Sequence, residues 1–181
     1  MTPAVSIFRD SPRHMSNKRH IISILLQNEA GALTRVAGLF ATRGYNIESL
    51  NVAATDDPTV SRLTLVTTGT EAVLSQVVNQ SLKLIDVVNV DDLTHDAHIE
   101  RELLLLKLKP NALQRAALEA AIKAAGAKIL CDDDSSVVIE LSDSVAVINR
   151  FVSDAAAYGD VLEVVRSGLL AVLRGVQTLR S

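Results

Sequence analysis

Residues 20–55 decide the fold, and they read HIISILLQNEAGALTRVAGLFATRGYNIESLNVAAT. The apolar run at 21–26 ends at Gln27 and Asn28, which predicts a strand followed by a turn. Within that turn, Gly31 permits backbone geometry or a close approach that a side chain would block. Apolar residues then recur at i, i+3, i+4 and i+7, which predicts a helix with one buried face formed by Leu33, Val36, Ala37 and Phe40. Gly44 stands where a left-handed helix stop is expected, and residues 46–54 alternate as a second strand.

The turn before this helix carries groups suited to binding a small ligand. A helix N-terminus offers unpaired N–H groups and about +0.5 of a charge, so it can hold a carboxylate without a basic side chain. The amides of Asn28 and Asn46 can accept from an ammonium group and donate to a carboxylate. Together with an anion's approach at Gly31, these groups suit the two ends of a free α-amino acid. The alternative is that Gly31 and Gly44 are only turn and cap residues and that both asparagines serve the turns.

The remaining sequence repeats one order of elements twice. In the first half, a turn at 56–58 leads to a strand at 60–68, a helix whose apolar stripe runs from 74 to 85, and a strand at 87–93. A short polar junction at 94–98 follows. The second half then predicts a strand at 103–108, a helix from 113 to Gly126, strands at 129–131 and 137–141, a helix at 145–156, a strand at 161–165 and a short apolar tail at 169–172.

Two details of this second half are expectations about packing and capping. The continuous leucines at 103–108 predict a strand buried on both faces, and Asp143 is a candidate N-cap for the helix after it. A four-stranded sheet with helices on one face leaves its other face and its edges open. We therefore expect dimerisation through sheet edges or helices.

Composition excludes several classes of function. The chain has 181 residues, a net charge of −3 and a pI near 5.8, so no basic footprint for nucleic acid is present. Aromatic residues make up 3% and Trp is absent, so base-stacking platforms are lacking, while a hydrophobic content of 48% is ample for a core. The single Cys131 fits a reducing compartment, and no apolar segment approaches a membrane span or a signal peptide. A cytoplasmic location is expected.

Catalytic and metal-binding patterns are weak. His95 and His98, near three aspartates, are spaced i, i+3 in a predicted linker that fixes no geometry. The acidic turn after Cys131 lacks the spacing of a calcium loop, so a solvated turn accounts for it better. Nucleophile–base, P-loop and zinc-protease motifs are absent from the sequence. We expect no catalytic residues, no metal and no cofactor in this chain.

The segment NEAGALTRVAGLFATRGYNIESL, followed by VAATDDPTVSRLTLVT, resembles the small, regulatory subunits of acetohydroxyacid synthase, also called acetolactate synthase. HIERELLLLKLK and DVLEVVRSGLLAVLRG resemble the C-terminal domain of that family, so the resemblance covers almost the whole chain. It implies an α+β fold of two consecutive ferredoxin-like βαββαβ sandwiches. The expected division is a disordered N-terminal extension at 1–18, an ACT amino-acid-binding domain at 19–95 and a C-terminal ferredoxin-like domain at 96–181.

The resemblance also implies a function and a site. The family's small subunits activate a catalytic large subunit, which carries thiamine diphosphate, magnesium and FAD, and confer feedback inhibition by valine or another branched-chain amino acid. Two ACT domains join as a homodimer and bind the effector at their interface, with Asn28 and Gly31 of one subunit facing Asn46 and Ile47 of the other. The implied effector site consists of Asn28, Ala30, Gly31, Ala32, Leu33, Asn46 and Ile47.

Two other classes of protein use similar folds. A free-standing ACT-domain sensor or transcription regulator would need a nucleic-acid-binding element, and no basic recognition helix is visible in the sequence. A small enzyme with a ferredoxin-like fold would need a catalytic cluster. Neither a nucleic acid nor a membrane is an expected partner.

Overall fold

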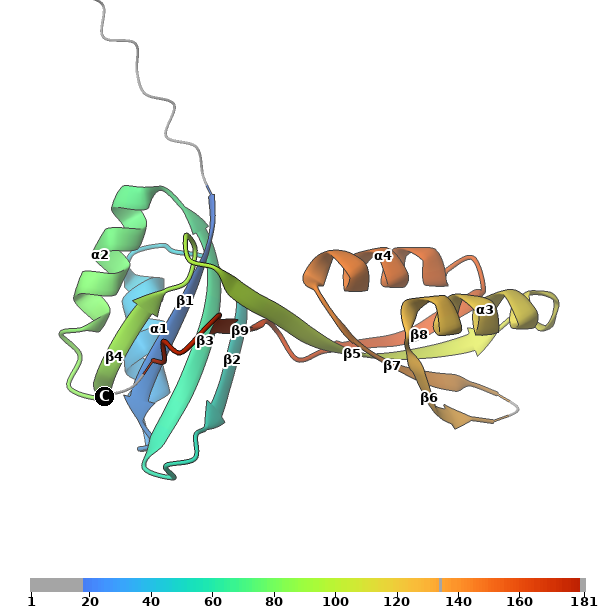
Figure 1. The fold of residues 1–181 in the computed structure, drawn as a ribbon, viewed down its shortest axis with the longest axis horizontal. Helices are drawn as coiled ribbons and strands as arrows, with labels where there is room; N and C mark the ends of the chain where they lie inside the picture. The colour runs from blue at the N-terminus through green and yellow to red at the C-terminus, as the bar shows by residue number, and fades with distance from the viewer. Residues whose placement is uncertain (1–17, 134, 180–181) are drawn as a thin grey trace, which may run out of the picture.

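The computed structural model describes residues 18–133 and 135–179, which form two α+β units connected by one long strand (Figure 1). Each unit has the order βαββαβ, so the predicted fold of two consecutive ferredoxin-like sandwiches is confirmed. The predicted N-terminal extension lies outside the described residues, except for Lys18, which is the first residue of β1.

The first unit is a four-stranded antiparallel sheet in the order β2-β3-β1-β4, with two helices on one face (Figure 1). Its elements are β1 (Lys18–Gln27), α1 (Ala32–Thr42), β2 (Ile47–Ala54), β3 (Val60–Gly69), α2 (Glu71–Ser81) and β4 (Val87–Asp92). Alternate residues of the two central strands, such as Ile22, Ile24, Leu63 and Leu65, are fully buried beneath the helices. Strand β2 is left at one edge of the sheet.

Helix α1 differs from expectation in the residues it buries. It begins after Gly31, whose φ is 90°, and Gly44 follows its end with φ 69°, as the pattern predicts. The buried positions are Ala32, Val36 and Phe40, whereas Leu33, expected in the stripe, is 40% exposed. Ala32, Val36 and Phe40 are spaced four apart and therefore share one face, and Leu33 is turned away by about 100° from Ala32.

The second unit has the sheet order β6-β7-β5-β8, again with helices on one face. Its elements are β5 (His98–Pro110), the short 3₁₀ helix η1 (Ala112–Gln114), α3 (Arg115–Ala125), β6 (Lys128–Asp132), β7 (Val137–Asp143), α4 (Val145–Ala155), β8 (Gly159–Arg166) and β9 (Leu170–Leu173).

Two expectations for the second unit are wrong. The leucines of β5 are buried on one face only, because Leu104, Leu106 and Leu108 lie under the helices while Leu103 is 37% exposed. Asp143 is not the N-cap of α4: Ser144 occupies that position, and the Asp143 carboxylate accepts from the Ser144 backbone N–H at 2.6 Å.

A further correction concerns the predicted apolar tail and the open sheet face. Residues Leu170–Leu173 form strand β9, which pairs with the first residues of β5, from His98 to Arg101. This pair, here called the β5–β9 ribbon, lies on the face of the first sheet opposite the helices (Figure 1). A third core forms there from Ile21, Val66, Leu93, Leu169 and Ala171. The ribbon covers that face because Leu169 and Ala171 alternate with the exposed Leu170 and Val172, the period of a strand with one buried side.

Leu169 and Leu170 allow a matched test of this third core. Leu169 is 1% exposed and its neighbour Leu170 is 47% exposed. Leu169→Ala should lower the free energy of unfolding in urea by about 2–5 kcal/mol, since it leaves a cavity under the ribbon. Leu170→Ala should change it by less than about 1 kcal/mol. Equal effects of the two substitutions would show that the ribbon does not dock as described.

Candidate functional site

The Gly31 turn leaves the N-terminus of α1 open to an anion. Gly31 is the N-cap residue and no side-chain hydrogen bond caps the helix. The first turn of α1, all of which the structure describes, contains no acidic side chain. The Ala32 N–H donates to the Glu29 carbonyl at 3.2 Å, which closes the turn. The positive end of the helix dipole therefore has no carboxylate within its own first turn to offset it.

Asn28 is anchored beside this turn by the loop between β2 and β3. Its backbone N–H donates to the Thr59 carbonyl at 2.7 Å, and its Nδ2 donates to the Pro58 carbonyl at 3.0 Å. The side chain is exposed, and its amide oxygen is the atom that can accept from an ammonium group. A groove of about 610 Å³ runs along this place, lined by Gln27, Asn28, Glu29, Pro58, Thr59, Val60 and Val88.

Arg35 is a residue of this site that sequence reasoning missed. A Cβ added at Gly31 would lie 3.1 Å from an Arg35 guanidinium nitrogen, so this side chain folds back over the turn. Arg35 also forms a two-pronged ion pair with Asp86, with Nη2 to Oδ1 at 2.7 Å and Nε to Oδ2. The hydrogen bond from Arg35 holds the pKa of Asp86 below its usual value and raises the pKa of Arg35. The available signal was that Arg35 lies four residues after Gly31, on the same side of the helix.

Asn46 and Ile47 lie at the opposite end of the first unit. The Thr67 hydroxyl donates to the Asn46 carbonyl at 2.6 Å, the Asn46 side chain is exposed, and Ile47 packs against the first core. Helix α1 runs the length of the unit between Gly31 and Asn46, and its 11 residues span about 16 Å. One chain thus carries two halves of the predicted site at opposite ends and does not bring them together.

The other predicted site residues differ in what they can offer a ligand. Ala30 and Leu33 are exposed, whereas Ala32 is buried in the first core. The Ala32 side chain is therefore enclosed by protein, and only its backbone faces the turn.

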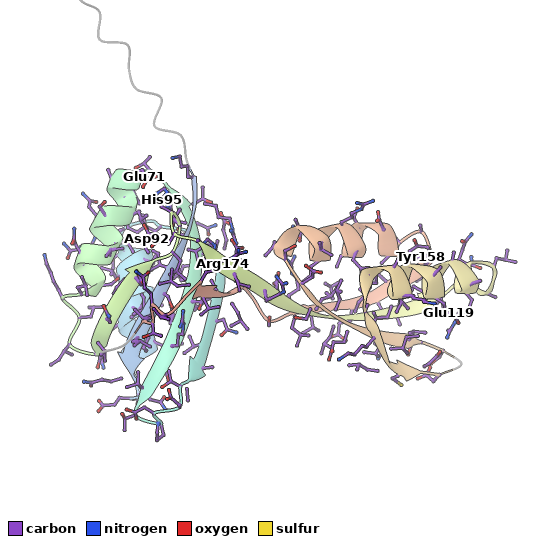
Figure 2. The ribbon with its side chains drawn as sticks, viewed as in Figure 1. Glu71, Asp92, His95, Glu119, Tyr158 and Arg174 are labelled. Atoms are coloured by element: carbon purple, nitrogen blue, oxygen red, sulfur yellow. The ribbon has the colours of Figure 1, made fainter. Side chains whose placement is uncertain are left out.

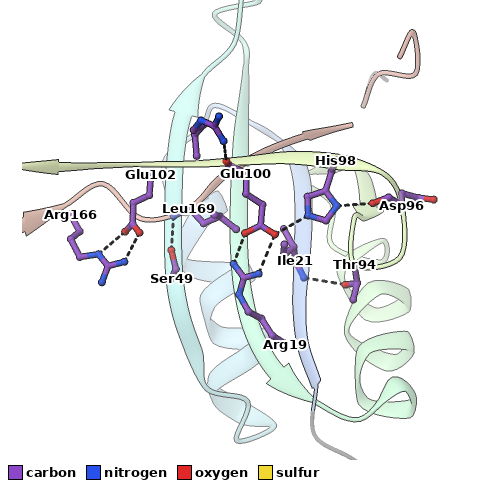
Figure 3. Close-up of polar contacts among 11 residues, drawn as sticks. Arg19, Ile21, Ser49, Thr94, Asp96, His98, Glu100, Glu102, Arg166 and Leu169 are labelled. Atoms are coloured by element: carbon purple, nitrogen blue, oxygen red, sulfur yellow. Dashed lines mark hydrogen bonds and ion pairs between the residues drawn. The ribbon is translucent and has the colours of Figure 1, made fainter. Parts of the chain in front are cut away.

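The histidines considered as metal ligands have separate partners. His95 lies beside Glu71 at the start of α2, with Nε2 to Oε1 at 3.3 Å (Figure 2). His98 instead contacts the Asp96 carbonyl at 2.7 Å and the Glu100 carboxylate at 2.9 Å (Figure 3). Burial lowers the pKa of His98, but the bonds to Glu100 and to the Asp96 carbonyl outweigh it and raise the pKa overall. Among the described residues, no group of three or more His, Cys, Asp or Glu side chains could hold a metal ion.

The sheet order and the Gly31 turn are those expected of an ACT domain, and a second unit of the same topology follows. Comparison with known families supports both parts: the family described as "AHAS small subunit-like ACT domain" matches residues 22–89, and "Small subunit of acetolactate synthase" matches residues 101–175. The chain belongs to the family of acetolactate synthase small subunits.

Relatives and a solved structure agree over almost the whole length. The chain is 41% identical to the acetolactate synthase isozyme 3 small subunit of Escherichia coli K12, over 90% of this chain and 99% of the relative. It is 35% identical to a probable acetolactate synthase small subunit of Archaeoglobus fulgidus, over 87% and 98% respectively. The crystal structure of the acetolactate synthase small subunit from Thermotoga maritima superposes with a TM-score of 0.80 at 27% identity, covering 88% of this chain and 99% of that one. Across residues 18–133 and 135–179, no helix is long and apolar enough to span a membrane.

The Arg35–Asp86 pair predicts a pH dependence of stability. Because the pKa of Asp86 is below its ordinary value of about 3.9, the pair contributes stability above that pH and loses it as the pH falls through the lowered pKa. Asp86→Asn should therefore lower the urea midpoint at pH 7, and the difference from wild type should disappear in acid. The exposed Asp160→Asn is the control. A difference that persists unchanged at pH 2 would exclude the ion pair as its source.

Proposed function

We propose that this chain is the regulatory partner of a thiamine-diphosphate-dependent acetolactate synthase catalytic subunit. It binds that subunit in the cytoplasm, raises its activity and makes it sensitive to feedback inhibition by a branched-chain amino acid, with valine as the first candidate. Thiamine diphosphate, magnesium and FAD belong to the catalytic partner in this proposal. The observation that carries it is the uncapped N-terminus of α1 behind Gly31, with the Asn28 amide beside it, in a member of this family.

The two ends of an amino acid fit the two kinds of group at this turn. The carboxylate would accept from backbone N–H groups at the start of α1, with the Arg35 guanidinium adding positive charge. The ammonium group would donate to the amide oxygen of Asn28. Ala30, Ala32 and Leu33 would contribute backbone, while Asn46 and Ile47 of a second copy would supply a polar contact and an aliphatic one.

A second copy is needed because the two half-sites lie at opposite ends of one chain. Strand β2 is an edge strand, and its Leu50 and Val52 are each 37% exposed. If β2 pairs antiparallel with β2 of a second copy, the start of the partner's strand lies against the end of this one. That end lies at the same end of the sheet as Asn28, which donates hydrogen bonds to the β2–β3 loop. Exposed edge strands are usually paired or covered, which favours this arrangement.

Inhibition then follows from linkage. An effector that binds better to one arrangement of the two ACT domains stabilises that arrangement, and the catalytic partner responds to it. Coupling of this kind is typically worth about 1–3 kcal/mol, and it must act in both directions. Valine should therefore bind more tightly to the inhibited complex than to the active one.

Asparagine substitutions test the site. Asn28→Ala and Asn46→Ala each remove a hydrogen bond to a charged group of the ligand, worth about 1.5–3 kcal/mol. Each should raise the valine concentration for half inhibition of the reconstituted enzyme by about tenfold or more, while stimulation of the catalytic subunit stays as in wild type. Asn79→Ala, on the exposed side of α2, is the matched control. Normal inhibition of both variants would refute this site.

Direct binding and complex formation separate the parts of the proposal. Calorimetric titration of the purified chain with valine, leucine and isoleucine should give saturable heat with at least one of them, and Asn28→Ala should lose it. The chain should also co-purify with the catalytic subunit. Amino-acid binding without such co-purification would instead support a free-standing ACT-domain sensor.

A further inference from the structure

Strand β2 contains a bulge that turns two nearby residues to opposite faces of the first sheet. Residues two apart in a regular strand share a face. In β2, however, Ile47 pairs with Thr67 while Ser49 pairs with Val66, so the register shifts at Glu48. Ile47 consequently packs against the core beneath the helices, and Ser49 lies on the opposite face, where its hydroxyl accepts from the Leu169 N–H. The bulge therefore lies between Ile47, on the proposed effector side of β2, and Ser49, on the ribbon side. These two residues are about 7 Å apart along the strand.

The segment between β8 and β9, residues 167–169 and here called the connector, docks on that second face of β2. The Leu169 N–H donates to the Ser49 hydroxyl oxygen at 2.9 Å, and Asn51 Nδ2 donates to the Ser167 carbonyl at 3.2 Å (Figure 3 shows the first of these bonds). Ser167 is also tied to β5, since its N–H donates to the Leu103 carbonyl at 3.0 Å and its hydroxyl accepts from the Leu103 N–H at 3.0 Å. The connector therefore joins β2 to the central strand of the second unit.

Gly168 makes this contact close. Its φ is 79°, and a Cβ at this position would lie 2.8 Å from the Ser49 hydroxyl and 3.5 Å from the Leu50 carbonyl oxygen. A side chain at this position would therefore require the Ser49 hydroxyl or the connector to shift. Gly175 has a similar φ of 87° but faces open space, with no atom within 4 Å of such a Cβ.

A cleft lies beside the connector. It measures about 420 Å³ and lies between β2 and the start of α4, where Glu48 and Leu50 face Val145, Arg166 and Gly168. The buried Glu102 pairs with Arg166 on the second-unit side, with Arg166 Nε to Glu102 Oε1 at 3.0 Å (Figure 3). The Glu102–Arg166 pair thus stabilises the second unit where it borders the cleft. The connector runs from there to β2.

We propose that the contact of Ser49 with Gly168 and Leu169 transmits amino-acid binding at the start of β2 to the C-terminal unit. The inference rests on the proposed effector function, since it requires a ligand at Asn46 and Ile47. A ligand that moves Ile47 moves the bulge, and the bulge displaces the Ser49 hydroxyl on the opposite face. The connector, held by that hydroxyl, then shifts the edge of the second unit across the cleft. Ser49 and Gly168 are positioning residues and do not touch the ligand.

A pair of glycine substitutions tests the coupling. Gly168→Ala and Gly175→Ala impose similar backbone strain, but only the first meets Ser49. Gly168→Ala should raise the valine concentration for half inhibition of the reconstituted enzyme by at least about fivefold, the lower end of typical allosteric coupling, while Gly175→Ala stays within about twofold of wild type. Stimulation without valine should be preserved in both. Equal valine sensitivity of the two folded variants overturns the proposal.

Ser49→Ala gives an answer even where Gly168→Ala fails to fold. It removes the acceptor of the Leu169 N–H without adding bulk, and it should weaken valine inhibition in the same direction, while Ser75→Ala on the exposed side of α2 should not. Wild-type inhibition in Ser49→Ala overturns the proposal.

Hydrogen exchange on the wild-type chain separates this inference from the proposed function. Saturating valine should change the exchange rate of a peptide covering 167–173 by about threefold or more, the mark of a coupled two-state element. Calorimetric binding of valine with unchanged exchange in that peptide would overturn the coupling and leave the effector site standing. Absence of valine binding by calorimetry would overturn both.

Discussion

Strand β5 belongs to both units at once, and this sharing constrains the rest of the molecule. Its first residues pair with β9, and this ribbon packs on one face of the first sheet. Its later residues form the centre of the second sheet, between β7 and β8. A hydrogen-bonded strand resists bending more than a linker rich in glycine and serine does. The two units are therefore not joined by a flexible linker. Their relative position depends on how the β5–β9 ribbon packs on the first sheet.

The candidate site is divided between the two ends of the first unit. One end of the first unit presents the Gly31 turn and Asn28, and the other presents Asn46 and Ile47, with α1 between them. In the proposed function a second copy, pairing through β2, would bring these ends together, so that ligand binding and subunit pairing would be one event. A ligand that binds at an interface stabilises the subunit arrangement to which it binds best. A regulatory subunit can use such a shift in arrangement to respond to its effector.

Sequence patterns predicted the elements well and the long-range packing poorly. The βαββαβ order, the start and end of α1 at Gly31 and Gly44, and the stop of α3 at Gly126 follow from local periodicity and turn chemistry. The third core could not be predicted, since four residues after β8 read equally well as an apolar tail and as a strand. Their role depends on a partner, β5, that is about 70 residues away in the chain. Arg35 was missed for a similar reason: its partner Asp86 lies 51 residues further on, and no local pattern links the two.

The contact between the ribbon and the first sheet is not uniformly apolar. Ile21, Val66 and Leu169 give it a hydrophobic centre, which favours docking. Beside that centre, the hydroxyl of the fully buried Ser23 has no hydrogen-bond partner within the part of the chain that the structure describes, which costs free energy. Arg62 is half-buried, burial lowers its pKa, and it donates to the Ala171 carbonyl of the ribbon at 2.9 Å. The contact thus combines apolar burial, which favours docking, with polar groups whose burial opposes it. In the proposed coupling, an effector that supplies about 1–3 kcal/mol would act on this mixed contact of apolar and polar groups.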